Sequence, residues 1–219
     1  MKICVTVPTR GDHPELLEQL VIDSGVPRHE FIIVRTANVS TPDGVTVIDD
    51  FGGLNIHRWW NTGIACAKER GADYVAVLND DISIEPGAIQ ELAAIAAKTG
   101  STIATPFKSR RRFKNRLPLR PVLIGSLWLL DLKTELRPDE NFHWWYGDDD
   151  LDIRARRDFN GIITMPINFE HVHGGEATES SSELEGFVRL DELYFKSKYP
   201  LPYFWRILDR KLGGILRHR

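Results

Sequence analysis

Short apolar runs alternate with segments of helical periodicity through the first half of the chain, and this alternation constrains the fold more than any other feature. The order is strand, helix, strand, strand, helix, strand, helix, strand, which predicts an α/β fold with a mostly parallel sheet and helices on both faces. The predicted strands are Ile3–Val7, Phe31–Val34, Val45–Ile48, Tyr74–Leu78 and Ile103–Thr105. The predicted helices are Pro14–Ile22, His57–Arg70 and one that begins at Pro86 and ends at Gly100.

The second half continues with shorter and less regular signals. The stretch from Val122 to Leu130 is strongly apolar, and a helix is predicted from Asp148 to Phe159. Two short strands are predicted after it, and the last forty residues read as one or two peripheral helices split by prolines. Those short strands are Ile162–Met165 and Ile167–Phe169, and the prolines are Pro200 and Pro202.

Composition excludes several classes of protein. Hydrophobic residues make up 42% and charged residues 27% of the 219 positions, as in globular proteins. Cys4 and Cys66 lie in apolar surroundings without metal-type spacing, so we expect reduced core thiols and a cytoplasmic protein. The net charge is −3, yet residues 108–120 carry seven Lys or Arg and no acid. An acidic body with two basic segments, the other being 203–219, argues against a nucleic-acid partner.

Polar residues follow three of the predicted strands. In α/β sheets, ligands bind beyond the carboxyl ends of the strands, so the loops after these strands are expected to meet at one edge. Two neighbouring carboxylates after a buried strand suit a hard cation such as Mg²⁺ or Mn²⁺, although Asn and Asp are also common in plain turns. The residues concerned are Arg10, Asn38, Asn79, Asp80 and Asp81.

His171 and His173 are candidate nitrogen ligands downstream of the acidic residues. Their i, i+2 spacing on an extended segment places both side chains on the same side. One of them together with Asp81 would leave positions on a metal open for a diphosphate and water. The alternative is a structural role for both imidazoles.

The segment WWYGDDDLDIR, from Trp144 to Arg154, crowds several carboxylates behind an aromatic run. Adjacent carboxylates are tolerated at a helix N-terminus, near a cation or beside basic groups, and crowding raises the proton affinity of one member, as a general base requires. The alternative is a solvated acidic helix start. Trp144, Trp145 and Tyr146 could form a platform for a sugar face, or simply pack in the core.

Four segments together resemble a known family. VPTRGD, NIHRWWNTGI, LNDDISIEPG and YGDDDLDIRARRDFNG are similar, in order and spacing, to motifs of the inverting, family-two glycosyltransferases of the GT-A fold. The stretch FHWWYGDDDLDIR is also similar to the acidic motif of β-1,4-galactosyltransferases. The resemblance covers roughly residues 1–175 and implies a GT-A-type, Rossmann-like domain over 1–178. Within it, 1–100 would bind the nucleotide sugar, 101–178 would hold the acceptor and catalytic residues, and 179–219 would be a helical extension.

The resemblance implies metal-dependent transfer of a sugar from a nucleotide-diphosphate donor to an acceptor hydroxyl, with inversion. Asp148 matches the catalytic base, and Asp149 and Asp150 would raise its proton affinity. Asp81 ends the DxD-type motif, and His171 or His173 matches the remaining ligand of Mn²⁺ or Mg²⁺. Residues placed on the donor side are Pro8, Thr9, Arg10, Asn38, Arg58, Asn79 and Asp80. Those on the acceptor side are Trp144, Trp145, Tyr146 and Asp149.

Two departures from the family pattern stand out. Gly147 occupies a position where many relatives have Glu, and the region IIVRTANVS lacks the Asp that usually contacts the nucleotide base. The nucleotide therefore stays open, with a UDP-sugar favoured, and the acceptor is a glycan, a glycolipid or a protein. The basic loop 108–120 is expected near the mouth of the site, or else as a solvated loop.

The tail from Tyr203 to Arg219 mixes apolar and basic residues, which suits an amphipathic helix on the inner face of an anionic membrane. Packing onto the domain or a dimer contact are the alternatives.

Two other functions are compatible with clustered Asp residues on an α/β sheet. A metal-dependent nucleotidyl or phosphoryl transferase would need a glycine-rich phosphate loop, but VPTRGDHPE has one glycine and no lysine. A non-catalytic sugar-binding relative would have no need of a base.

Overall fold

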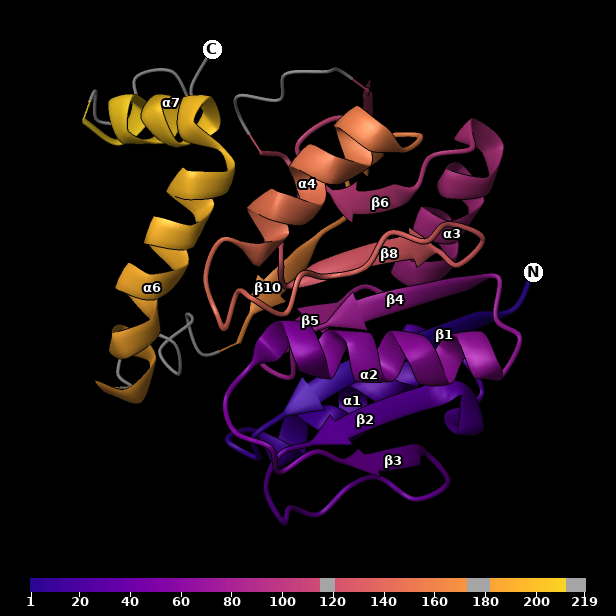
Figure 1. Cartoon of the computed structure of the whole chain (residues 1–219). Coiled ribbons are helices and arrows are strands. Elements are labelled where there is room, and N and C mark those ends of the chain that lie inside the picture. The colour runs from indigo at the N-terminus through magenta and orange to yellow at the C-terminus, as the bar shows by residue number, and fades with distance from the viewer. Residues whose placement is uncertain (115–120, 173–181, 212–219) are drawn as a thin grey trace.

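The computed structural model of the chain describes residues 1–114, 121–172 and 182–211. An eight-stranded sheet forms the centre, with the strand order β3-β2-β1-β4-β8-β6-β9-β7 (Figure 1). Strands β8 and β7 run against the other six. The expectation of a mostly parallel sheet is confirmed. The strands are β1 (Ile3–Thr9), β2 (Phe31–Arg35), β3 (Thr46–Asp49), β4 (Tyr74–Leu78), β6 (Ile103–Pro106), β7 (Arg111–Phe113), β8 (Leu127–Asp131) and β9 (Ile162–Met165).

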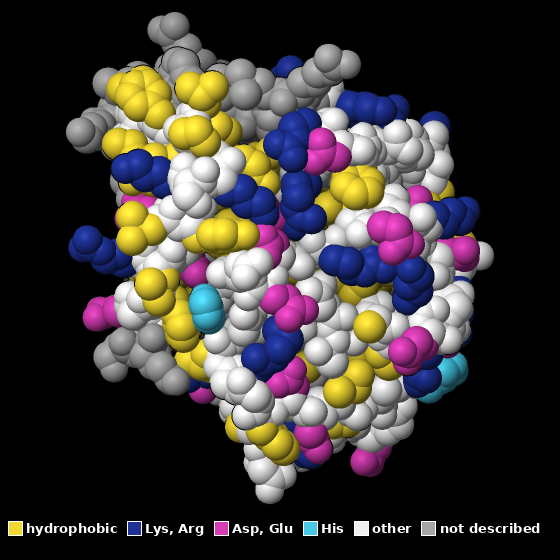
Figure 2. All heavy atoms as spheres, in the orientation of Figure 1, with side chains coloured by type: hydrophobic (Ala, Val, Ile, Leu, Met, Phe, Trp, Pro, Cys, Tyr) yellow, Lys and Arg dark blue, Asp and Glu magenta, His cyan; other side chains and the backbone are white. Residues whose placement is uncertain are grey.

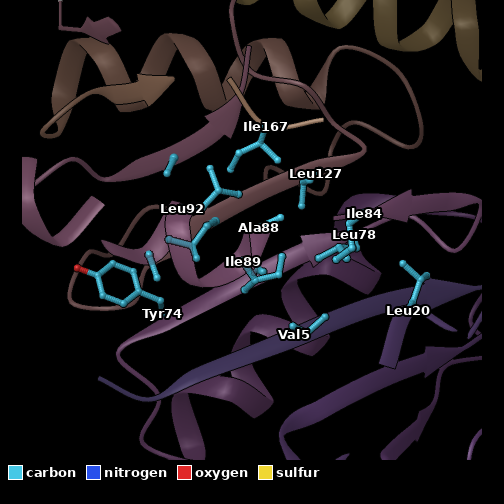
Figure 3. Packing of buried hydrophobic residues seen from close by; sticks show 14 of the residues in the cluster. Val5, Leu20, Tyr74, Leu78, Ile84, Ala88, Ile89, Leu92, Leu127 and Ile167 are labelled. Atoms are coloured by element: carbon cyan, nitrogen blue, oxygen red, sulfur yellow. The ribbon is translucent and has the colours of Figure 1, made fainter. Parts of the chain in front are cut away.

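Helices cover both faces of this sheet. The helices α1 (Pro14–Ser24) and α3 (Ala88–Thr99) lie on one face, and α2 (Ile56–Glu69) and α4 (Gly147–Asp158) lie on the other (Figure 1). A 3₁₀ turn, η1 (Arg28–Glu30), leads into β2. Side chains alternate along β1, so that Val5 and Val7 pack beneath α1 and α3, whereas Cys4 packs beneath α2. Figure 3 shows part of the first cluster, which includes Ile89 and Leu92 of α3 and Leu127 of β8.

A close approach of helix to strand fixes the position of α2. A Cβ atom at Gly63 would lie 1.8 Å from Oγ1 of Thr6. Only glycine fits there, so α2 can lie directly on β1 with its first turn at the carboxyl end of that strand. Asn55 caps the helix by accepting a hydrogen bond from the backbone N–H of Arg58.

Four elements differ from the sequence prediction. The short strands β5 (Ile82–Ile84) and β7 were not predicted, because three residues give little periodicity. The strand expected at Ile167–Phe169 is instead β10 (Phe169–His171), and it pairs with β5 in a separate antiparallel ribbon, His171 opposite Ile82. The apolar stretch 122–130 forms strand only from Leu127 onward.

The C-terminal helices were expected at the periphery, but the first of them packs on the domain. Helix α6 (Ser182–Lys198) is followed, after a bend at Tyr199 and Pro200, by α7 (Pro200–Lys211) (Figure 1). Phe195 of α6 and Tyr199 lie in one buried cluster with Phe142 and Tyr146. Within the described part of the chain, no helix has the length and apolar character needed to cross a membrane.

Candidate active site

A cavity of about 550 Å³ opens at the carboxyl ends of β1 and β4. The residues singled out from the sequence that line it are Pro8, Thr9, Arg10, Asn79, Asp80, Asp81, Trp144, Trp145, Tyr146 and Asp148. The edge of the sheet and the start of α4 therefore face one another across this space. The further lining residues, which sequence reasoning did not assign to the site, are Asp12, Ile56, His57, Trp59, Trp60, Gly125, Ser126, Val188 and Glu192.

Several expected residues do not line the cavity. The guanidinium of Arg58 donates to both carboxylate oxygens of Asp50, at 3.0 and 2.8 Å, and to the carbonyl of Gly53. Asn38, Asp149 and His171 lie outside the lining, and Asp149 is buried. His173 lies outside the described residues.

On the sheet side, adjacent strands bring Thr9 and Asp80 together. Oγ1 of Thr9 donates to Oδ2 of Asp80 at 2.6 Å and accepts from the backbone N–H of Gly11 at 3.0 Å. Burial raises the pKa of Asp80 to about 6, and the nearby charge of Asp81 acts in the same direction, against the hydrogen bond from Thr9. Asp80 is thus tied to β1 and carries most of its charge at neutral pH.

Asp81 and His171 form the candidate metal centre, brought together by the pairing of β5 with β10. Oδ2 of Asp81 lies 3.5 Å from Nδ1 of His171, and Nε2 of the same imidazole lies 3.0 Å from Oγ of Ser126. Among the described residues, Oδ1 of Asp81 is buried without a hydrogen-bond partner. A buried, unsatisfied carboxylate oxygen beside an imidazole is a donor set that fits Mn²⁺ or Mg²⁺. Among the described residues, no group of three or more His, Cys, Asp or Glu is arranged around a common point.

Asp148 lies in the first turn of α4. Its Oδ1 accepts from the backbone N–H of Asp149 at 2.9 Å, and the positive end of the helix dipole favours its ionised form. Tyr146, the preceding N-cap residue, has a left-handed backbone with φ of 64°. A Cβ atom at Gly125 would lie 3.4 Å from Oδ2 of Asp148, so the glycine keeps the space beside this oxygen open.

A buried histidine accounts for Gly147, one of the departures from the family pattern. A Cβ atom at Gly147 would lie 1.7 Å from Nε2 of His57, which excludes the Glu of many relatives at this position. Nδ1 of His57 lies 2.9 Å from the carbonyl oxygen of Phe142. Burial lowers the pKa of His57, outweighing that hydrogen bond and nearby carboxylates, so the ring is neutral.

The other carboxylates of the acidic segment anchor the fold. Asp150 accepts from Nε of Arg154 at 2.7 Å and from Oη of Tyr199 at 2.7 Å, and it pairs with Lys198 at 2.7 Å. Asp152 accepts from two backbone N–H groups, at 2.6 and 3.0 Å, and from Arg156. The charge of Asp150 is therefore compensated by two cations, Arg154 and Lys198.

A residue of α6 holds the aromatic segment in place. Asp191 is fully buried, and it accepts hydrogen bonds from the backbone N–H groups of His143, Trp144 and Trp145 at 3.0, 2.9 and 2.8 Å. The indole of Trp144 meets that of Trp59 edge to face, 5.9 Å between centroids. One signal in the sequence was missed. Asp191 lies on the same helical face as the buried residues Leu184 and Phe195, and a carboxylate buried there needs hydrogen-bond donors.

The basic segment lies elsewhere. Residues 111–113 form β7, the edge strand at the far end of the sheet from β3, and residues 108–114 do not line the cavity. The described part of the segment thus contributes no residue to the lining of the cavity. Residues 115–120 lie outside the described residues.

Among the comparisons with known proteins, only the comparison with solved structures gave matches, and these support the fold. No family model matches the chain, and a search of curated proteins found no match. S. aureus TarS 1–349 in complex with UDP-GlcNAc aligns with a TM-score of 0.60 and 14% identity, over 90% of this chain and 67% of that one. The same fragment in complex with UDP gives 0.58 and 15%, over 76% and 58%. A longer TarS structure gives 0.54 and 16%, over 75% and 35%.

The chain thus spans 58% of the TarS fragment in complex with UDP and 35% of the longer TarS structure. At 14–16% identity the likeness concerns the backbone arrangement, not the chemistry. The chain has a GT-A-type, Rossmann-like fold, as the sequence motifs implied.

Proposed function

We propose that the protein is a metal-dependent, inverting glycosyltransferase that moves a sugar from a nucleotide diphosphate to an acceptor hydroxyl. The observation that carries the proposal is the placement of Asp81 and Asp148 in the lining of one cavity, on a GT-A-type fold. The structural neighbours bound UDP and UDP-GlcNAc, which makes a UDP-sugar the first donor to test.

In this reaction the acceptor oxygen attacks the anomeric carbon from the face opposite the diphosphate. The bond between that carbon and the diphosphate oxygen breaks, and the acceptor proton passes to the carboxylate of Asp148. The helix N-terminus keeps Asp148 ionised until it takes the proton. The neutral ring of His57 fills the space beside Gly147 and places no positive charge next to the base.

The charge of the cavity supports the proposal of a bound cation. Among the described residues, five carboxylates line the cavity, against one guanidinium, that of Arg10. A diphosphate would be repelled by this surface. A divalent cation bound by Asp81 and His171 would offset the charge that develops on the departing diphosphate.

Calorimetry with a panel of nucleotide sugars, with and without Mn²⁺, tests the proposal. We expect one nucleotide sugar to bind only when Mn²⁺ is present, and nucleotide diphosphate to be released on incubation. Asp81→Asn should abolish the metal-dependent binding, whereas Asp158→Asn, at the opposite end of α4 and exposed to solvent, should not change it. Absence of binding by every nucleotide sugar would refute the function. Binding without release, equal in wild type and Asp148→Asn, would indicate a non-catalytic relative.

We also propose that α7 contacts an anionic membrane. Figure 2 shows apolar side chains gathered over α7 and the adjoining end of α6, and Leu193, Leu201 and Phe204 are exposed there. Basic residues follow in the sequence at Arg206, Arg210 and Lys211. Co-sedimentation with vesicles containing phosphatidylserine should exceed that with phosphatidylcholine vesicles and fall with salt. Leu201→Ser/Phe204→Ser should abolish it, and equal sedimentation of this variant would contradict the contact.

A further inference from the structure

Helix α6 supplies a wall of the cavity that the motif-bearing part of the chain does not provide. Val188 and Glu192 line the cavity together with Trp144 and Trp145. The i, i+4 spacing places Val188 and Glu192 on one face of the helix. The aromatic platform and the α6 wall thus enclose the same space, next to Asp148.

The carboxylate of Glu192 is held in this wall by one of its oxygens. Oη of Tyr203 donates to Oε1 at 3.2 Å, and Oη of Tyr146 lies 3.5 Å from the same oxygen. Among the described residues, Oε2 has no hydrogen-bond partner. A positioned carboxylate with one oxygen available is suited to accept hydrogen bonds from hydroxyl groups.

Both sides of the cavity are acidic, but only the sheet side also carries a guanidinium. On the sheet side, Arg10 lies 3.7 Å from Asp12 and partly offsets the charge of the carboxylates there. On the α6 side, the described lining residues that carry charge are Asp148 and Glu192, both acidic. An anionic group brought against such a surface is repelled, which weakens its binding.

We infer that the α6 wall makes the acceptor subsite selective for uncharged polyhydroxyl acceptors and against anionic ones, with Glu192 accepting hydrogen bonds from acceptor hydroxyl groups. This inference rests on the proposed function, since it concerns the acceptor of that reaction. Sugar rings fit both parts of the subsite, because their C–H faces pack on indole rings while their hydroxyl groups reach the carboxylate.

Acceptor kinetics of charge variants on α6 test the inference. UDP release would be measured with Mn²⁺ and the nucleotide sugar that binds in the calorimetric panel, beginning with UDP-GlcNAc. Acceptors would be a set of neutral p-nitrophenyl glycosides and the glucuronide that matches the glucoside. The variants are Glu192→Gln and Glu192→Lys, with Glu185→Gln and Glu185→Lys as matched controls, since Glu185 is exposed on the same helix and does not line the cavity.

In the wild type we expect the KM for the glucuronide to exceed that for the neutral glucoside by about tenfold or more. Glu192→Lys should lower this ratio by about tenfold, and Glu192→Gln should raise the KM for the neutral glucoside by about tenfold through loss of a charge-assisted hydrogen bond. The Glu185 variants should keep the wild-type ratio.

A glucuronide preferred by the wild type, or a ratio unchanged by Glu192→Lys, would overturn the inference. Donor binding separates that outcome from failure of the proposed function. A protein that binds the nucleotide sugar and releases UDP, yet shows no effect of Glu192 on the acceptor KM, refutes the acceptor wall alone. Absence of donor binding refutes the function itself.

Discussion

The two halves of the cavity are held in place by different kinds of interaction. On the proposed donor side, Thr9 ends β1 and Asp80 follows the neighbouring parallel strand β4, and one hydrogen bond joins them. On the acceptor side, residues 143–145 are held by Asp191, which lies 46 to 48 positions later in the chain.

This difference shows where the site is rigid for local reasons and where it depends on a distant element. The donor half follows from the sheet, because parallel strands end at a common edge. The acceptor half needs α6 to dock, and its docking contacts are buried and polar. Variants can therefore disturb one half and leave the other intact.

The largest expected effect is the loss of transfer in Asp148→Asn. Removing the proton acceptor should lower kcat by about 10²- to 10⁴-fold, the usual contribution of a general base. Donor affinity, measured by calorimetry with Mn²⁺, should change little because Asp148 lies on the acceptor side. An unchanged kcat would show that Asp148 is not the general base.

The next effect concerns the anchor of the acceptor half. Asp191→Ala leaves three backbone N–H groups without their acceptor, and we expect a loss of about 3 kcal/mol in the free energy of unfolding. Urea unfolding measures the change. Below the denaturation midpoint, the folded variant should still bind the donor while its acceptor KM rises. A parallel loss of donor affinity would show that the two halves are not independent.

A smaller effect is expected at the contact between Gly147 and His57. Gly147→Ala forces a methyl group against the imidazole and should cost about 2 kcal/mol of stability, as overpacking does. The double variant with His57→Ala should regain part of this loss, because the opposing ring is absent. Thermal unfolding of the four proteins of the cycle measures the coupling, and strictly additive losses would contradict direct contact.

The smallest effect is the acid sensitivity of the α6 docking. Burial opposes ionisation of Asp139, but hydrogen bonds from Lys198, Asn141 and Tyr194 outweigh it and hold the pKa of this carboxyl well below its usual range. A depressed pKa stabilises the fold above the unfolded-state value of about 3.9, and this contribution is lost as the pH falls toward the folded-state value.

Asp139→Asn should therefore lower the free energy of unfolding by about 1 kcal/mol at pH 6, and the difference from the wild type should shrink towards pH 3. Urea unfolding between pH 6 and pH 3 measures it. Asp158→Asn, which removes an exposed ion pair at the C-terminal end of α4, is the control. Its free energy of unfolding should differ little from that of the wild type at any pH. A pH-independent difference for Asp139→Asn would mean that ionisation of Asp139 does not matter.

The sequence predicted the sheet edge that lines the cavity because its signals are local. A buried strand that ends in Asn79-Asp80-Asp81 shows both the strand and the polar edge in consecutive residues. Arg58 was assigned to the donor side by analogy, but the structure engages it with Asp50, eight positions earlier, in a loop whose conformation no periodicity reveals. The shift of β10 escaped prediction for a similar reason, because its register depends on pairing with β5.

By itself, the sequence determined the order of strands and helices, the sheet edge at which Asp81 lies and the helix that begins beside Asp148. These follow from the alternation of apolar residues and from capping, which act over a few residues. Tertiary structure alone decided how the carboxylates of the acidic segment divide their roles, and why Gly147 must be glycine. It also brought Asp191 and Glu192 to the site. The physical reason is that a buried charge is stable only beside its partners. Two partners of Asp150 are Lys198, at the end of α6, and Tyr199, and only folding brings them near.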